Sequence, residues 1–459
     1  MIEVVKYSNI KQRSIEFNFE EDQPDNALTD FATSFDVFPV VLVSKSDQDF
    51  ATTIAPSAIQ NIKLFNNKFL PEIEILCIDE NGTLMDDFFP LDNDIILSIF
   101  VKSTSEKTMP IRMDFRILEY DPLQASIENT EKKFTLKGIL DVEGLHYTIF
   151  ESFSNETSYN VLKNIASKIG LGFATNMSNT DDSMTWINPA NTYLEFIQNV
   201  TKRAYVSDET FVWSFIDFYY NLNFVDIETE LSESPKELQS LNTNFTNDDK
   251  TEETTDDFVE LYLTTSDNLA MTNKFIAKYN LSNQSFKTNL ESGYQYSTRW
   301  FDRTDNTIEQ ILTQENQTDD PNLIQLRTNE PIVDYNWGDT FLGKIDEDNV
   351  HKKYHLALTL NEINISKLHK VTMTVTLQMI NFEVKRFQKI LIDFYDINMT
   401  KNDVGVKEKL SGYWFVTGIN YNFKRNGGAT QEITLVRRDL NLKYTELHDI
   451  RQNLNQKNK

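Results

Sequence analysis

The segment 371–379 has the most regular pattern of apolar and polar residues in the chain. Its apolar residues are Val371, Met373, Val375, Leu377 and Met379, and they alternate with Thr372, Thr374, Thr376 and Gln378. Successive side chains of a β-strand point to opposite faces of the sheet, so a period of two predicts a strand with one buried and one polar face. We therefore expect the five apolar side chains to share a buried face, in a sheet whose other face meets water or a partner.

Further β-strands are indicated near both ends of the chain. In the first third, apolar or alternating runs occupy residues 38–43, 73–78, 94–102, 111–117 and 134–140. Asn81-Gly82 follows the second run and is a turn signal. In the last third, the runs 413–424 and 430–437 flank Asn426-Gly427-Gly428, which is a strong hairpin signal. The 32 Phe and 18 Tyr also favour sheet-rich packing.

The hydrophobic period changes to that of a helix between about residues 150 and 207. One helical face is formed by Val161, Leu162, Ile165, Ala166 and Ile169. Thr157 or Ser158 can cap the start of this helix, and Gly170 suits its end. A second helix is expected to open near Asn191, and residues 211–227 then have the pattern of a β-hairpin.

The middle of the chain has weaker signals. Residues 239–257 are rich in Thr, Asn and acidic residues, which is the composition of a flexible loop. The following segment to residue 330 is mixed, with a short helix expected around Ile308, Ile311 and Leu312. Residues 352–360 look like the start of a strand. The polar residues after 440 are expected to fray.

Composition excludes several classes of protein. At roughly 150 residues per domain, the 459 residues suggest about three domains. The 44 basic and 70 acidic side chains give a net charge of −26, which disfavours binding to nucleic acid or to anionic membranes. The N-terminus lacks a secretory signal pattern, and no apolar run approaches the ~18 residues of a membrane helix. Cys77 cannot form an internal disulfide and is expected to be a core residue, so the chain is expected to fold in a cytoplasm.

The candidate cofactor and metal motifs are incomplete. Gly170-Leu171-Gly172 follows a helix, whereas a phosphate-binding loop follows a strand, and Thr175 stands where a third glycine belongs. His351 and His355 are four residues apart and share a face on a helix or a strand, with acidic residues at 346–348, but there is no HExxH motif. The remaining histidines stand alone: His146, His369 and His448. We therefore expect no catalytic, cofactor-binding or metal-binding residues.

Acidic pairs and tryptophans offer the remaining candidates for chemistry. The pairs include Asp86-Asp87, Asp181-Asp182 and Asp248-Asp249. A glycosidase needs two carboxylates on opposing walls of a cleft, which adjacency in sequence does not supply, so we interpret these pairs as solvated loop charges. The tryptophans are Trp186, Trp213, Trp300, Trp337 and Trp414. Most lie in or beside apolar segments, which favours core or interface packing over a sugar-binding platform.

Several segments, taken in order, resemble a known family. A helix, an extended segment with Trp, a second helix and an aromatic hairpin follow one another in residues 155–176, 184–200 and 209–227. A closing hairpin occupies 412–440, and an early hairpin with an acidic turn occupies 73–101. In this order the segments resemble the baseplate hub proteins of contractile-tailed bacteriophages, which are related to the hub part of type VI secretion spike proteins. The resemblance covers most of the chain and is carried by the order of the pieces.

The resemblance implies a mainly β (α+β) fold with two tail-tube-like antiparallel β-barrels and inserted smaller domains. The first barrel domain would span 1–148 and a small helical domain 149–208. The second barrel would combine 209–238 with 331–440. An acidic loop and a mixed inserted domain would occupy 239–330, and a polar tail 441–459.

The function implied by the resemblance is architectural rather than enzymatic. The chain would form a homotrimeric ring in the virion baseplate, with the tail tube or its initiator above, the central spike below and other baseplate proteins around it. DNA would pass through without sequence-specific binding, and no membrane would be involved. We expect the channel wall to be polar and net negative, with few Lys or Arg, since a basic wall would grip DNA. The alternatives are a tail-associated glycan or peptidoglycan hydrolase and a carbohydrate-binding surface module.

Overall fold

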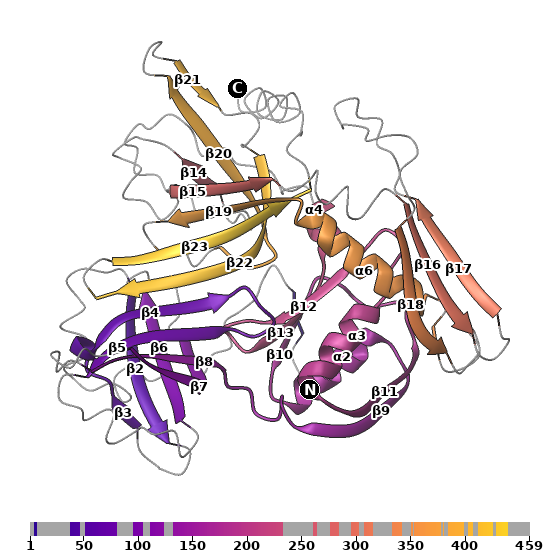
Figure 1. Ribbon diagram of the computed structural model, residues 1–459, viewed down its shortest axis with the longest axis horizontal. Helices are drawn as coiled ribbons and strands as arrows, with labels where there is room; N and C mark the ends of the chain where they lie inside the picture. Colours follow the sequence, from indigo (N-terminus) through magenta and orange to yellow (C-terminus); the bar gives the residue numbers. More distant parts are fainter. Residues whose placement is uncertain are drawn as a thin grey trace.

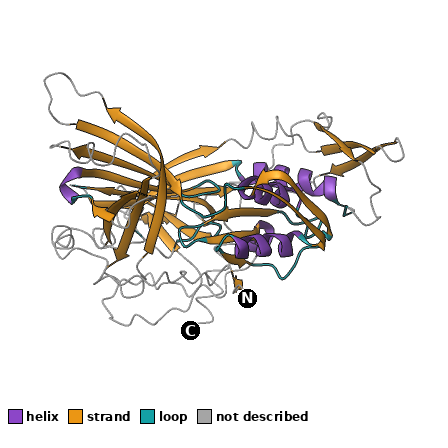
Figure 2. Ribbon diagram, turned by 90° about the horizontal axis from the view of Figure 1, so that it is seen from below, coloured by secondary structure: helices purple, strands orange, loops and turns teal. Residues whose placement is uncertain are grey.

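The computed structural model shows a mostly β protein with few helices, as the sequence predicts. It describes residues 4–6, 37–45, 51–79, 95–103, 111–123, 132–232, 260–263, 276–283, 295–302, 307–314, 333–341, 350–351, 353–377, 380, 384–398, 403–406, 412–425 and 428–438. Within these residues, Figure 2 shows the strands of a large sheet on one side and the longer helices gathered beside it.

The large sheet has fourteen strands and joins the two ends of the chain. Its main path runs β15 (Ile276–Asn283), β19 (Val371–Leu377), β23 (Gly428–Arg437), β22 (Gly412–Lys424), β4 (Ile59–Asn66), β5 (Glu72–Asp79), β8 (Lys132–Leu140), β7 (Ile111–Leu123), β6 (Ile95–Ser103), β2 (Val37–Lys45) and β3 (Ala51–Thr53). A branch from β22 holds β20 (Lys389–Asn398), which pairs with β14 (Glu260–Leu263) and β21 (Asp403–Val406). The described strands form an open path, and no closed barrel is seen among them.

The pairing of β22 with β4 is the seam between the two ends of the chain. The strands are antiparallel, with Tyr421 opposite Leu64 and Phe423 opposite Ile62. In Figure 1 the indigo N-terminal strands pass into the yellow C-terminal strands at this seam. The hairpin of β22 and β23 that forms the C-terminal side was predicted from the Asn-Gly-Gly signal and is confirmed.

The alternating segment is the central example of a predicted strand. Val371, Met373, Val375 and Leu377 are all 0% exposed, while the threonines between them are half-buried on the other face. The prediction is confirmed for these four side chains, and Met379 lies outside the residues whose side chains are described. β19 is flanked by β15 and β23, so its polar face continues onto both neighbours.

A smaller unit, the α/β body, packs beside the large sheet. Its sheet has the order β1 (Val4–Lys6), β10 (Gly172–Thr175), β13 (Asn221–Asp226) and β12 (Val212–Ile216). The helices α2 (Ser158–Lys168) and α3 (Tyr193–Arg203) contact this sheet, and the short α4 (Ile227–Ser232) follows it. The predicted hairpin at 211–227 is confirmed as β12 and β13.

Both predicted helices begin and end at recognisable caps. Thr157 caps α2 by accepting a hydrogen bond from the Asn160 amide at 3.3 Å, and Thr192 with Glu195 forms a capping box on α3. Gly170 follows α2 with a φ of +72°, a left-handed conformation that favours glycine. At Gly172 an added Cβ would collide with the Asn221 side chain on β13. The two glycines therefore serve a helix end and close packing.

A curved two-stranded ribbon lies against α2 and α3. It consists of β9 (Thr148–Glu156) and β11 (Met184–Thr192), which are antiparallel (Figure 1). Two shifts in register mark bulges, and each contains a non-glycine residue with positive φ, Asn155 and Ala190. Bulges bend a strand, which accounts for the curvature. Residues 149–208 thus contain both expected helices together with three strands.

Two predictions of secondary structure were wrong. The helix expected at Ile308–Leu312 is β17 (Thr307–Gln314), which pairs with β16 (Gln295–Asp302) in a three-stranded sheet completed by β18 (Val333–Phe341). The strand expected within 352–360 is the start of α6 (Tyr354–Leu368). The reason is that Leu356, Leu358 and Leu360 alternate like a strand, whereas the cluster with Tyr205 uses Leu356, Ala357 and Leu360 at helical spacing.

Candidate assembly surface

The large sheet presents one continuous polar face across eight neighbouring strands, from β15 to β7. On strands β15, β19, β23 and β22 this face consists of Lys278, Asn280, Ser282, Thr372, Thr374, Thr376, Thr430, Glu432, Thr434, Asn420, Asn422 and Lys424. On strands β4, β5, β8 and β7 it consists of Asn61, Lys63, Phe65, Glu72, Glu74, Leu76, Lys133, Thr135, Lys137, Ile139, Arg116, Glu119 and Asp121. These side chains are half-buried or exposed, and on the strands from β19 to β8 the opposite face is the buried core. We call this surface the polar sheet face.

Charges on the polar sheet face are nearly balanced. The side chains named above include six basic and five acidic residues, which gives this surface a net charge of +1 (6 − 5). Cross-strand ion pairs use several of them: Lys63 Nζ lies 2.6 Å from Glu74, and Lys137 Nζ lies 3.1 Å from Glu119 and 2.9 Å from Asp121. The hydrogen bond from Lys137 holds the pKa of Asp121 below its usual range. Exposed pairs add little stability, so their main effect is to neutralise the surface.

Arg386 ties three parts of the molecule together directly behind the seam. It is 4% exposed, and its guanidinium donates hydrogen bonds to the carbonyl oxygens of Thr417, Asn67 and Lys68 and to the Asn66 side chain. Thr417 belongs to β22, and the other acceptors lie at the end of β4 and in the turn after it. The guanidinium also lies over an aromatic ring of β12, 4.3 Å from the centroid of Phe215.

The residue after Arg386 adopts an unusual backbone conformation. Phe387 has a φ of +61°, which is rare for an aromatic residue. Its amide donates to the Val416 carbonyl at 2.7 Å, and its ring packs on Phe215 and Phe415 in a buried cluster. These contacts hold the strained backbone, and the conformation places Arg386 in the junction.

Asn361 fixes α6 to the α/β body. It is 3% exposed, and its Nδ2 donates to the carbonyl oxygens of Thr201, Lys202 and Ala204 at the C-terminal end of α3, at 3.0–3.4 Å. Its Oδ1 accepts from the Val212 amide at 3.0 Å. One side chain thus binds four backbone groups at the end of α3 and the start of β12, where the regular helical hydrogen bonds run out.

Replacing Asn361 is expected to destabilise the protein. Asn361→Ala removes the side chain that bonds these backbone groups, and we expect a loss of about 2–4 kcal/mol in the free energy of unfolding. Asn361→Asp should cost at least as much, because a carboxylate faces three carbonyl oxygens. Urea denaturation measures both. The matched control is the exposed Asn160→Ala, for which a change below ~0.5 kcal/mol is expected; equal midpoints for all three variants would contradict this role.

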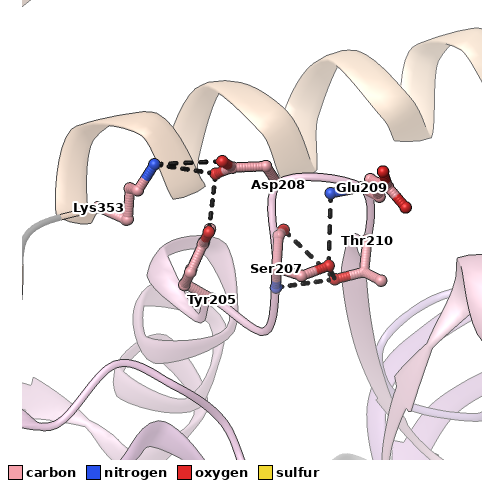
Figure 3. Close-up of polar contacts among 6 residues, drawn as sticks. All are labelled: Tyr205, Ser207, Asp208, Glu209, Thr210 and Lys353. Atoms are coloured by element: carbon pink, nitrogen blue, oxygen red, sulfur yellow. Dashed lines mark hydrogen bonds and ion pairs between the residues drawn. The ribbon is translucent and has the colours of Figure 1, made fainter.

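The loop between α3 and β12 supports the start of α6 from below. Figure 3 shows Asp208 accepting from the Tyr205 hydroxyl at 2.7 Å and pairing with Lys353 Nζ at 3.1 Å. Ser207 and Thr210 close the loop through their hydroxyls, 3.1 Å apart. The hydrogen bond from Tyr205, together with Lys353, holds the pKa of Asp208 below its usual range. This is a local anchor rather than a reactive arrangement.

The acidic pair at 181–182 corrects the expectation of solvated charge. Asp181 is exposed, but Asp182 is 1% exposed and accepts from the amide and hydroxyl of Ser158, the hydroxyl of Thr180 and the amide of Tyr205. It therefore joins the start of α2 to the end of α3. The pairs at 86–87 and 248–249 lie outside the described residues.

The other predicted residues fall into structural positions. Cys77 is buried, and burial raises the pKa of its thiol to about 12. Trp186 and Trp414 are core residues, as expected, and Trp213 is half-buried; the side chains of Trp300 and Trp337 lie outside the described set.

The histidines gather no ligands around them. His351 and His355 are both buried, and the described residues contain no group of three or more His, Cys, Asp or Glu that could hold a metal ion. Residues 346–348 and His448 lie outside the described set, His146 is exposed, and His369 Nδ1 lies 2.8 Å from the Ile365 carbonyl. No described helix is long and apolar enough to cross a membrane.

Comparison with known proteins identifies the fold. No protein-family model and no curated protein matches the sequence. In structure the chain is similar to the 43 kDa tail protein of prophage MuSo2 from Shewanella oneidensis, with a TM-score of 0.51 at 9% identity over 88% of this chain and 99% of that protein. A tail protein from Neisseria meningitidis is less similar, with a TM-score of 0.48 at 8% identity over 87% of this chain and 96% of that protein. An Escherichia coli component of the type VI secretion system has a TM-score of 0.41 at 8% identity over 86% of this chain and 76% of that protein. The fold rests on the first, so the resemblance to phage tail proteins is confirmed at the level of the fold: this chain has the fold of the MuSo2 tail protein.

Proposed function

We propose that this chain is a structural baseplate hub subunit of a phage tail. In this proposal three copies form a ring in the virion that joins the tail tube to the central spike, with other baseplate proteins around it. The observation that carries the proposal is the polar sheet face, in which strands from both ends of the chain form one surface. A tail fold shared over nearly the whole length of both chains supports it.

The proposed domain boundaries follow the sequence assignment. Two tube-like units would comprise 1–148 and 209–238 with 331–440, separated by 149–208 and 239–330 and followed by the tail 441–459. Within this scheme β4, β5, β7 and β8 belong to the first unit, and β19, β22 and β23 to the second. β13 pairs with β10 and β12 pairs with β13, so 209–238 also takes part in the α/β body.

The polar sheet face is suited to line a channel for DNA. It has threonine and asparagine side chains in its C-terminal half and paired charges in its N-terminal half. A neutral wall neither binds phosphates by counterion release nor repels them strongly. If this face lines the channel, the wall is close to neutral rather than net negative as the sequence suggested, because Lys63 and Lys137 offset their acidic neighbours.

Copy number in purified tails tests the ring. A trimer beneath a sixfold tube gives three copies of this chain for every six subunits in one ring of the tube. Quantitative mass spectrometry with isotope-labelled peptides is expected to return that ratio when the number of tube rings is known. Six copies of this chain per tail would contradict the trimer.

The rival functions have separate tests. A hydrolase requires cleavage of peptidoglycan or polysaccharide by the purified chain that is lost when one carboxylate is changed; we expect no cleavage. A carbohydrate-binding module requires aromatic residues exposed in a groove. The large exposed apolar residues in the described part are Leu118, Tyr147, Phe150 and Ile187, so two of the four are aromatic, whereas Trp186 and Trp414 are buried.

A further inference from the structure

The start of α6 contains two buried imidazoles that the proposed function does not use. His351 is 7% exposed and His355 is 2% exposed, one helical turn further on. The carbonyl of His351 accepts the Tyr354 amide at 3.1 Å, so this residue opens α6. Its ring packs beside Trp186 of β11 and Tyr205 of the loop after α3, with centroids 6.3 and 6.4 Å away.

The hydrogen bonds of His351 fit a neutral ring. Nε2 lies 3.3 Å from the carbonyl oxygen of Arg203, which can only accept, so we assign the proton to this nitrogen. The buried Nδ1 has no hydrogen-bond partner among the described residues. A second proton, on Nδ1, would give the His351 ring a full positive charge. It would also create a buried donor without an acceptor.

Charged groups face the ring from two sides. Asp182 and Asp181, in the segment before β11, favour the protonated form, and Arg203 of α3 opposes it. The Asp182 carboxylate already accepts the hydrogen bonds from α2 and Tyr205 described above. Burial outweighs the acids and lowers the pKa of His351 below its ordinary value.

The remaining titratable groups belong to the same contact. Lys353 pairs with Asp208 and lies 5.9 Å from the Tyr205 ring centroid, and His355 contacts Tyr354 edge-on. Through these contacts the first turn of α6 lies on the polar and aromatic side chains of β11 and of the loop after α3. The start of α6 is therefore held by aromatic and charged groups and by buried imidazoles, and burial lowers the pKa of one of these groups, His351.

The sign of the pH effect follows from linkage. The pKa of His351 is lowered while the start of α6 lies on the α/β body, so the ring binds a proton more readily once the start of α6 has separated from that body. Acid therefore favours the separation. The stabilisation is present at pH values above 6.5, the ordinary pKa of an imidazole, and is lost as the pH falls below that value.

We propose that His351 is an acid-sensitive clasp that holds the start of α6 on the α/β body. Since α6 contacts β16 and leads directly into β19, release would loosen the link between the three-stranded sheet and the large sheet.

Hydrogen exchange of the full chain tests the clasp. Between about pH 7.5 and about pH 5.5, exchange in peptides covering 353–362 is expected to rise about threefold or more after correction for the intrinsic chemical rate. Peptides from α2 should change little. Unchanged exchange in α6, or an equal rise in α2 that signals unfolding of the whole body, would overturn the proposal.

Variants assign the effect to one ring. His351→Gln keeps a donor for the Arg203 carbonyl but does not titrate, so the pH response of α6 should disappear; His351→Phe provides a second non-titrating ring if the first variant does not fold. His146→Gln, at an exposed position, should behave as the parent chain. A response that persists in the folded His351 variants, or that disappears only in His355→Gln, would assign the switch elsewhere and overturn the proposal.

Discussion

Val375→Asp is expected to abolish the stable fold. Val375 is 0% exposed in the middle of β19, between β15 and β23, so an aspartate there places a carboxylate in an apolar core. A buried charge without a partner costs well above ~4 kcal/mol, which approaches the whole stability of many domains. We expect loss of soluble protein, or a fall of the thermal midpoint beyond measurement, in circular dichroism of the purified chain.

The neighbouring threonine provides the matched control. Thr374 stands on the polar sheet face, opposite Asn280 and Thr434. Thr374→Asp adds the same charge one residue away but leaves it in contact with water, so we expect a change below ~1 kcal/mol. If the two variants lose stability equally, the assignment of buried and polar faces is wrong.

Arg386→Ala is expected to have the next largest effect. The change removes the donors for four acceptors behind the seam and opens a cavity beside Phe215, which should cost about 3–5 kcal/mol. Arg386→Lys should recover little, because one ammonium cannot reproduce the planar fork that reaches these acceptors. Chemical denaturation measures both variants.

Arg425 serves as the control for this junction. It is exposed and donates to the Ser57 carbonyl at 2.7 Å, so it also links the two ends of the chain. Arg425→Ala should cost less than ~1 kcal/mol, because water replaces the lost contact. A loss as large as that of Arg386→Ala would mean that any arginine at the seam has the same effect and that burial is not the cause.

The strands and helices with strong periodic patterns could be predicted from the sequence. β19 follows from strict alternation, β22 and β23 from the Asn-Gly-Gly signal, and α2 and α3 from helical spacing with Thr caps. The type of α6 could not be predicted, because three leucines alternate while the packing face is set by contact with Tyr205. β17 depends on its pairing with β16, which no local pattern encodes.

The residues that hold the site together gave no signal in the sequence. Arg386, Asn361 and Asp182 act through backbone groups that are from 23 to 319 positions away along the chain. Asp182 stood in an acidic pair and was interpreted as solvated, yet the ends of α2 and α3 enclose it. The continuous face depends on the β4–β22 pairing, which joins strands from opposite ends of the chain.

A reconstruction of the assembled tail at side-chain detail tests the central claim most directly. The proposal predicts three copies of this chain in one ring, with the side chains of the polar sheet face, Thr374, Asn422 and Lys63 among them, pointing into the channel. Rotational symmetry of the ring and the identity of the side chains on its inner wall are read from the same map. A sixfold ring of this chain, or a channel wall formed by residues outside the polar sheet face, would contradict the account.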